Sequence, residues 1–390
     1  MFKKFVKGIF LGMSIFSGLS FPIAFEYPYI YKDPRIMGMG GAFTAVGGNT
    51  SSLFYNPAGL GKIKKDAGFK VDLIGFTGSI SEDACNFLQD FQDALDVGDR
   101  DGDGDDADDQ LKAVNEVLRK YRGKTLHYSL NTFPNVAKRF NRFSFGIGAL
   151  RSIRFDAIPH QGFGNTGILS VDADIMYGGI GGFAYSFLGN KLSVGIGIKY
   201  FHRERVFKDF TARELIENEN NLENYIEDEV RKSGSAISGD IGVIYTIPSL
   251  VYGIDTSLGI SYMNIGDLDF GDAGKIPSTL NVGVALTKER KSRFLNKLTF
   301  AFDIVDITKN YEEDEDWGKR LRAGFELNVW NGKRSDFILR LGSYQGYLTA
   351  GAELRFAVIR AVFTTYAEEI GAYSGQDDNR RYMFSLYITW

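Results

Sequence analysis

The last eleven residues read Arg380-Arg-Tyr-Met-Phe-Ser-Leu-Tyr-Ile-Thr-Trp390, and this stretch decides the fold. Side chains alternate between the two faces of a strand. One face here carries Tyr382, Phe384, Leu386, Ile388 and Trp390, and the other carries Met383, Ser385, Tyr387 and Thr389. In a transmembrane β-barrel such an apolar face meets lipid, and a terminal aromatic residue lies at the membrane interface. The ending therefore predicts a membrane-spanning β-barrel.

The same two-residue period recurs through most of the chain and predicts fourteen strands. An even number of antiparallel strands is typical of bacterial outer-membrane barrels. In 321–329, for example, Leu321, Phe325 and Leu327 share one face, while Arg322 and Glu326 share the other. The predicted strands are 67–80, 124–133, 142–156, 166–187, 191–206, 236–247, 254–265, 280–288, 296–306, 318–329, 335–344, 346–356, 358–366 and 380–390.

The connections between these strands fall into a mostly long set and a mostly short set, which alternate along the chain. Outer-membrane barrels have long outer loops and short periplasmic turns. The two longest connections are 81–123 and 207–235, which are acidic and contain helix-like stretches, so we expect small helical insertions in outer loops. The connection 134–141, which contains the basic pair Lys138-Arg139, is expected to be a short periplasmic turn.

The chain begins with the features of an export signal. Lys3, Lys4 and Lys7 precede an apolar stretch that ends at Leu19, and the following residues 20–24 end in the small residue Ala24. This order of a positive region, an apolar region and a small residue is that of a secretory signal peptide. We therefore predict a signal peptide at 1–24, and a short N-terminal anchor is the alternative.

Composition excludes several classes of protein. Mean hydropathy is −0.15, which is too polar for a bundle of membrane helices, while 32 Phe, 20 Tyr and 46 Gly suit strands with aromatic girdles and tight turns. A net charge of −4 without a basic stripe argues against a nucleic-acid partner. The single cysteine excludes an intramolecular disulfide. His127, His160 and His202 lack ligand spacing, and no Gly-x-Ser-x-Gly elbow occurs, so we expect no enzyme activity.

A segment rich in small residues precedes the first strand, and two motifs in it resemble a known family. Met37-Gly38-Met39-Gly40-Gly41-Ala42 and, further on, Asn56-Pro57-Ala58 resemble the N-terminal hatch of FadL-type outer-membrane transporters of hydrophobic compounds. The candidate hatch residues are Gly38, Gly40, Gly41, Asn56, Pro57 and Ala58. PorV-like proteins of secretion systems and TraF-like exported barrels share this hatch opening.

The resemblance implies a hatch at 25–62 that plugs a barrel formed by 63–390. Hydrophobic molecules, such as long-chain fatty acids, would be captured outside and would leave through a wall opening or past a rearranged hatch. Asn56-Pro57 suits a rigid turn, because Pro fixes one backbone dihedral and Asn caps neighbouring backbone groups. The same turn chemistry fits a purely structural plug.

An acidic stretch in the first long connection resembles the start of an EF-hand. Asp99, Asp101, Asp103 and Asp105 alternate, and Gly104 takes the sixth position. Gln110 stands where the bidentate Glu of an EF-hand belongs. Calcium at 99–110 is therefore a hypothesis beside the simpler interpretation of a solvated acidic loop, and no other cofactor is expected.

Charged residues of the late strands are predicted to face the lumen. They are Arg322, Glu326, Arg340, Glu353, Arg355 and Arg360. An arginine among them could hold a carboxylate head group, and the alternative is a ladder of salt bridges that satisfies buried charges.

The sequence thus predicts an all-β, fourteen-stranded antiparallel barrel in the bacterial outer membrane. The expected partners are membrane lipid, hydrophobic small molecules and the barrel-assembly machinery. The apolar face that ends in Trp390 resembles the C-terminal signal that this machinery recognises. Passive uptake of hydrophobic compounds is the first functional hypothesis. A structural or docking role in a secretion or conjugal-transfer apparatus is the alternative.

Overall fold

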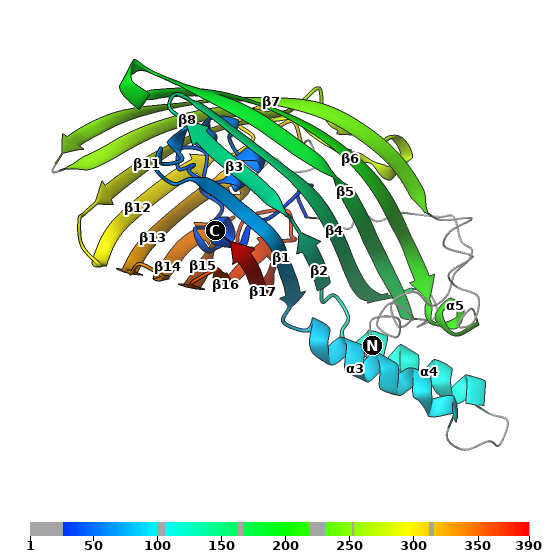
Figure 1. The fold of residues 1–390 in the computed structure, drawn as a ribbon. Coiled ribbons are helices and arrows are strands. Elements are labelled where there is room, and N and C mark those ends of the chain that lie inside the picture. The colour runs from blue at the N-terminus through cyan, green and yellow to red at the C-terminus, as the bar shows by residue number, and fades with distance from the viewer. Residues whose placement is uncertain are drawn as a thin grey trace.

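The computed structural model describes residues 26–99, 106–162, 167–217, 231–251, 253–311 and 316–389. Within these residues an antiparallel sheet closes on itself, because the last strand pairs with the first from Asp72–Thr389 to Ser81–Arg381 (Figure 1). The sheet is a closed barrel of fourteen strands, so the predicted fold class is confirmed. Helices in the described residues are few, and none is long and apolar enough to cross a membrane.

The fourteen strands occupy fifteen labelled stretches, because β2 and β3 are two parts of one interrupted strand. The stretches are β1 (Phe69–Ser81), β2 (Leu126–Thr132), β3 (Asn135–Phe140), β4 (Phe143–Gln161), β5 (Gly167–Phe187), β6 (Leu192–Thr211), β7 (Lys232–Val251), β8 (Ile254–Ile265), β11 (Thr279–Glu289), β12 (Phe294–Ile304), β13 (Leu321–Asn331), β14 (Ser335–Tyr344), β15 (Tyr347–Phe356), β16 (Ile359–Glu369) and β17 (Asp378–Thr389).

The expected turn at 134–141 is wrong. Residues 135–140 form β3, which pairs with both β1 and β4, and the chain reverses at Asn141, whose φ is 51°. Lys138-Arg139 therefore belongs to the wall. Pro134 misled the sequence reasoning: a proline weakens a strand, and here it interrupts the strand without ending it.

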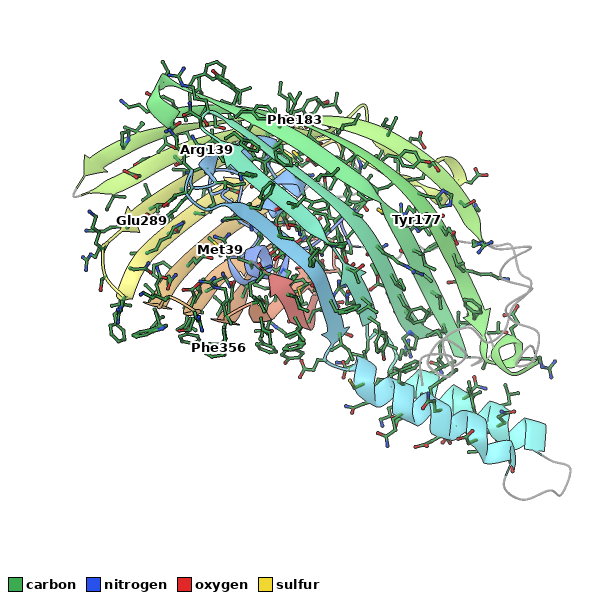
Figure 2. The ribbon with its side chains drawn as sticks, in the orientation of Figure 1. Met39, Arg139, Tyr177, Phe183, Glu289 and Phe356 are labelled. Atoms are coloured by element: carbon green, nitrogen blue, oxygen red, sulfur yellow. The ribbon has the colours of Figure 1, made fainter. Side chains whose placement is uncertain are left out.

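The two faces of the wall differ as the alternation predicts. Phe183, Phe356 and Tyr177 point outward, and Met39 lies inside the barrel (Figure 2). On β17, Phe384 is 56% exposed on the outer face, while Ser385 and Tyr387 are buried on the lumen face. Soluble proteins rarely expose apolar patches of this extent, so the outer surface is that of a membrane-facing barrel. Trp390 lies outside the described residues.

Most short connections lie at one end of the barrel and the long ones lie at the other, where the two-residue turn 345–346 is the exception among the described residues. We call the end with the short connections, which include 141–142, 290–293 and 357–358, the turn end. The opposite end, the helix end, carries α3 (Ala84–Leu95), α4 (Asp106–Lys120) and α5 (Ala212–Glu217), so helical insertions in the long connections are confirmed.

The helical hairpin α3–α4 packs on the outer face of the wall at the helix end. Phe87 and Leu118 of the hairpin join one buried cluster with Val171 of β5 and Val206 of β6. The neighbouring Asp172 points the other way, into the lumen, where it meets Arg205. The hairpin thereby removes part of the outer apolar face from the surroundings.

Residues 26–63, which we call the internal segment, lie inside the barrel. They contain α2 (Pro34–Gly38) and the short 3-10 helices η1 (Thr50–Phe54) and η2 (Pro57–Lys62), and they are enclosed by the strands (Figure 1). Ile36, Met39 and Phe43 are buried against each other and against Ala285 and Ala301 of the wall.

Candidate functional site: plug and lumen

Asn56 ties the internal segment to the barrel wall. Its side-chain oxygen accepts a hydrogen bond from the Ala58 amide, which caps η2, and Pro57 takes the first helical position. Its side-chain amide donates to the Thr44 carbonyl at 2.7 Å and approaches the Ile260 carbonyl of β8 at 3.3 Å. Asn56 is 1% exposed, so every polar atom of its amide needs such a partner.

The glycines of the first motif allow the segment to approach the wall closely. Gly40 has a φ of 62°, and a side chain there would collide with backbone atoms of Ala323 and Ser343. Gly38 lies against Gly351, where a Cβ on Gly38 would be 3.3 Å from the Cα atom of Gly351, which is a tight contact. Glycine is therefore required at Gly40, where the internal segment meets β13 and β14, and is favoured at Gly38 beside β15.

The predicted lumen charges on β13, β14 and β15 form an ion-pair ladder that also holds the internal segment. Arg35 donates two hydrogen bonds of 2.8 Å to the Glu326 carboxylate, and Arg340 Nε donates a third to Glu326 Oε2. Arg340 Nη2 continues the ladder to Glu353 at 2.6 Å. Bidentate arginine–carboxylate pairs are strong and directional, so the ladder fixes α2 to the wall.

The remaining predicted lumen residues also face the interior. Arg355 pairs with Asp336, and Arg360 pairs with Asp72 of β1 at 3.0 Å. Arg322 is buried, donates to the backbone carbonyls of Lys319 and Leu321, and stacks over the Tyr344 ring.

An apolar cluster fills the lumen where the internal segment crosses β2 to β7. Tyr31, Phe54 and Phe133 form an aromatic triad with centroid separations of 5.2, 5.6 and 4.9 Å. Leu150 and Phe201 of the wall belong to the same cluster.

The connection between β8 and β11 completes this apolar cluster. Leu268, Phe270 and Ile276 of that connection are almost fully buried and join it from the helix end. The length of the connection between the predicted strands 254–265 and 280–288 indicates an outer loop, so this inward fold differs from the sequence-based expectation. The apolar residues within that stretch were the available signal.

The wall is irregular directly beside the aromatic triad. The pairing of β1 shifts between Asp72 and Ile74, and on the neighbouring strand Phe133 and Pro134 separate β2 from β3. Proline offers no amide to the ladder, so this part of the β1 seam lacks regular bonding. Phe133 is 4% exposed and turns into the lumen.

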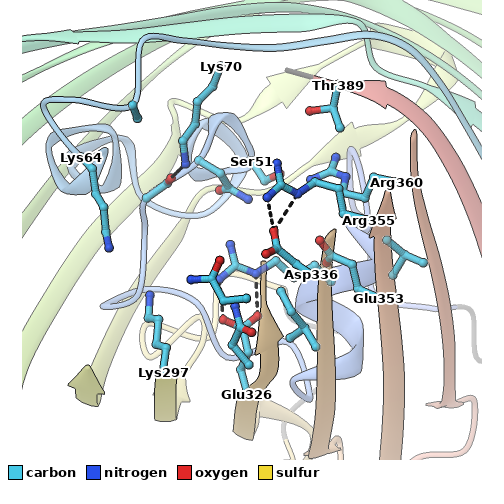
Figure 3. A pocket seen from close by; sticks show the side chains of 18 of the residues that line it. Ser51, Lys64, Lys70, Lys297, Glu326, Asp336, Glu353, Arg355, Arg360 and Thr389 are labelled. Carbon is cyan, nitrogen blue, oxygen red and sulfur yellow. Dashed lines mark hydrogen bonds and ion pairs between the residues drawn. The ribbon is translucent and has the colours of Figure 1, made fainter. Parts of the chain in front are cut away.

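A cavity of about 1110 Å³ lies at the turn end, between the internal segment and the wall. Figure 3 shows Lys64, Lys70 and Lys297 around it, opposite Arg355 and Arg360. Its lining is rich in charged and polar side chains, so the cavity is not an apolar groove. The apolar cluster and this cavity thus occupy different parts of the lumen.

A buried ion network lies at the helix end of the internal segment. Glu26 pairs with Lys32 and accepts from Arg381 at 2.6 Å, and His127 Nδ1 lies 2.6 Å from Asp156. Burial alone would raise the pKa of Glu26, but the charges of Arg381 and Lys32 hold it well below its ordinary value. Glu26, His127 and Asp156 lie close enough together to hold a metal ion, yet cations already neutralise both carboxylates.

Two predictions fall outside the described residues. The signal peptide at 1–24 is one of them. The other is the acidic calcium candidate: Asp99 ends a short 3-10 helix, but its side chain and residues 100–105, with Asp101, Asp103 and Asp105, are outside.

Comparison with known proteins gives matches in structure only. No family model matches the chain, and no curated protein matches its sequence. The toluene transporter TodX of Pseudomonas putida superposes with a TM-score of 0.50 at 11% identity, over 91% of this chain and 96% of that one. Two further structures match with lower TM-scores. The toluene transporter TbuX of Ralstonia pickettii has a TM-score of 0.48 at 13% identity, over 92% of this chain and 98% of that one. A FadL homologue of Pseudomonas aeruginosa has a TM-score of 0.40 at 12% identity, over 94% of this chain and 99% of that one.

The chain is a closed fourteen-stranded β-barrel of the transmembrane type, and residues 26–63 lie inside it. More specifically, it has the fold of the FadL-type channels for hydrophobic compounds, so the predicted resemblance is confirmed at the level of fold. The two toluene transporters are described as such by their own names, and the likeness of this chain to them concerns the fold.

Proposed function

We propose that the protein lets hydrophobic compounds cross the bacterial outer membrane by passive diffusion. The observation that carries the proposal is the apolar cluster around Tyr31, Phe54 and Phe133, because it is an apolar zone inside a lumen whose two ends are charged. An apolar site attracts lipophilic molecules that a water-filled pore would not retain. The TodX-like fold supports the same class of cargo.

In this proposal the helix end faces outward and the turn end faces the periplasm, as the lengths of the connections indicate. Cargo enters past the inward-folded connection that carries Phe270, reaches the aromatic triad, and leaves sideways through the irregular β1 seam beside Phe133. Aromatic rings on the path suit small aromatic molecules as well as acyl chains. Because the cluster is packed, passage requires Phe133 or the internal segment to move.

The test is uptake by intact cells of the source bacterium with and without the gene. Deletion is expected to slow uptake of labelled toluene or oleate, and the wild-type gene is expected to restore it. Uptake of a hydrophilic sugar serves as the control and should not change.

Co-purification of the tagged barrel from the same cells separates the two functional hypotheses. Unchanged uptake of toluene and oleate, together with a stoichiometric partner on the barrel, would overturn the transport proposal in favour of a docking role.

A further inference from the structure

The cavity at the turn end has more positive than negative charge on its walls. The basic residues that line it are Arg35, Lys62, Lys64, Lys70, Arg290, Lys291, Arg293, Lys297, Arg340, Arg355 and Arg360. The acidic ones are Asp33, Asp72, Glu289, Glu326, Asp336 and Glu353. Most of the carboxylates are used by the arginines of the ladder and its neighbours, which leaves the lysines short of partners.

Two of the lysines have no carboxylate partner within the described residues. Lys62 Nζ donates to Ser257 Oγ at 2.7 Å and to the Ala45 carbonyl, and Lys70 Nζ donates to the Gly48 carbonyl at 2.9 Å. Both side chains are half-buried. A desolvated ammonium held only by neutral oxygens is costly, and an anion nearby lowers that cost.

Neighbouring cations repel the charges of Lys62 and Lys70, and a bound anion would offset this repulsion. Glu289 is shared between Lys64 at 3.2 Å and Lys297 at 3.8 Å, so one carboxylate serves two lysines. The charge of Lys297 acts on both Lys62 and Lys70, and that of Arg360 acts on Lys70. Figure 3 shows Lys64, Lys70 and Lys297 reaching into the same space.

Two guanidinium groups in the wall of the cavity have a nitrogen without an acceptor among the described residues. Arg340 Nη1 and Arg360 Nε are buried and have no hydrogen-bond partner in the part of the chain that the structure describes. Both residues line the cavity. Buried guanidinium nitrogens are rarely left without an acceptor.

We propose that this cavity binds a phosphate-type oxyanion between Lys62 of the internal segment and Lys70 and Lys297 of the wall. The oxyanion is either a free phosphate from the periplasmic side or the head group of a phospholipid. Because the ligand contacts both the plug and the barrel, it stabilises the plugged state, and opening the plug weakens its binding by the same factor. This site does not depend on the identity of the cargo.

The test is isothermal titration calorimetry on the purified full-length barrel at pH 7, with ionic strength held constant by sodium chloride. One arm titrates inorganic phosphate and the other titrates soluble dihexanoyl phosphatidic acid. Saturable binding in either arm supports the site. The tighter of the two probes identifies the source of the phosphate group.

Variants connect the heat signal to the cavity. Lys62→Gln with Lys70→Gln is expected to weaken binding by roughly tenfold or more. Lys62→Arg with Lys70→Arg keeps the charges and should retain most of the affinity. Lys65→Gln is the matched control, because Lys65 is exposed, bonds Asn141 and does not line the cavity. Each variant is first checked for the folded barrel by its heat-dependent gel mobility.

Two results would overturn the proposal. One is the absence of saturable heat in both arms with the wild-type barrel. The other is equal affinity of the double glutamine variant and the Lys65→Gln control. Either result leaves the uptake proposal untouched, because uptake is measured on a different cargo and a different part of the lumen.

Discussion

At the scale of single residues, a few buried polar side chains hold the internal segment to the wall by hydrogen bonds. Asn56 is the clearest case, since its amide serves η2, the Thr44 carbonyl and the carbonyl of Ile260 in the wall together. Asp303 plays a similar part from β12, where one carboxylate oxygen accepts from the amides of Phe43 and Thr44 at 2.6 and 2.7 Å. The position of the internal segment therefore depends on these hydrogen bonds as well as on packing.

Replacing Asn56 with Asp tests this coupling. The substitution keeps the shape but removes the amide donor and places a negative charge beside two carbonyl oxygens. We expect the internal segment to lose about 1–3 kcal/mol of local stability. Hydrogen exchange of amides 44–58 should become faster. Asn141→Asp in an exposed turn is the control, and equal exchange in both variants would show that Asn56 does not anchor the plug.

Lys62 gives the proposed oxyanion site a pH dependence. Burial, followed by the charge of Lys297, lowers the pKa of Lys62 to about 8, against the opposing effects of Asp255 and Glu289. Lys62 is thus charged below that pH and loses its charge above it, whereas an exposed lysine stays charged to about pH 10.

The affinity for sulfate should fall as pH rises from 7 to 9. Sulfate is the suitable probe, because its own charge does not change in this range. Calorimetric titration at the two pH values measures the effect, and Lys62→Arg combined with Lys70→Arg should remove most of it, because both lysines contact the anion in this proposal. An affinity that stays constant or rises toward pH 9 contradicts the assignment of Lys62 to the site.

At the scale of elements, α2 is held by the ladder that runs from Arg35 through Glu326 and Arg340 to Glu353. The sequence predicted that Glu326, Arg340 and Glu353 face the lumen, because alternation along a strand assigns each residue to a face. It could not predict that Arg35 joins them, because that contact spans 291 positions along the chain.

Glu326→Gln tests the role of the ladder. The change removes the carboxylate charge that lies between Arg35 and Arg340. Removing one partner of a buried ion pair lowers the stability by about 3 kcal/mol. We expect faster hydrogen exchange over residues 33–46, and faster uptake if the segment gates the path. Glu82→Gln at the exposed helix end is the control. Unchanged exchange in Glu326→Gln would mean that glycine-mediated packing alone holds α2.

The interrupted strand shows where sequence patterns fail. Strand periodicity located the second strand correctly up to Phe133 but ended it there, because Pro134 and the polar residues after it have the composition of a turn. The pairing of β3 with both neighbours keeps the strand going. Long-range pairing therefore outweighed local preference at this point.

At the scale of the whole molecule, alternation and connection lengths were enough to predict the barrel. The closure of its sheet and its apolar outer face follow from a membrane environment, which requires backbone groups at every strand edge to be paired. The contents of the lumen were less predictable. Leu268 and Phe270 fold inward from a connection that has no strand periodicity of its own, and the cations of the turn-end cavity come from five separate stretches. Such convergence is set by the closed sheet rather than by any local motif.

The central claim is that hydrophobic cargo passes the aromatic triad and leaves beside Phe133. Phe133→Ala removes the ring that fills the lumen next to the irregular seam. In a packed core such a change lowers the free energy of unfolding by about 3–5 kcal/mol, and we expect the barrel to remain folded. The missing ring opens space along the proposed path. Phe363→Ala on the outer face is the matched control, since that ring is 48% exposed.

The most direct measurement is the initial rate of labelled toluene uptake by a Gram-negative host that lacks such a channel. Each variant is produced at the same level in the outer membrane of that host. The account predicts that the wild-type barrel raises the rate above the empty-vector host, that Phe133→Ala raises it further, and that Phe363→Ala equals wild type. A wild-type rate no higher than that of the empty host, or a Phe133→Ala rate no higher than that of Phe363→Ala, would contradict it.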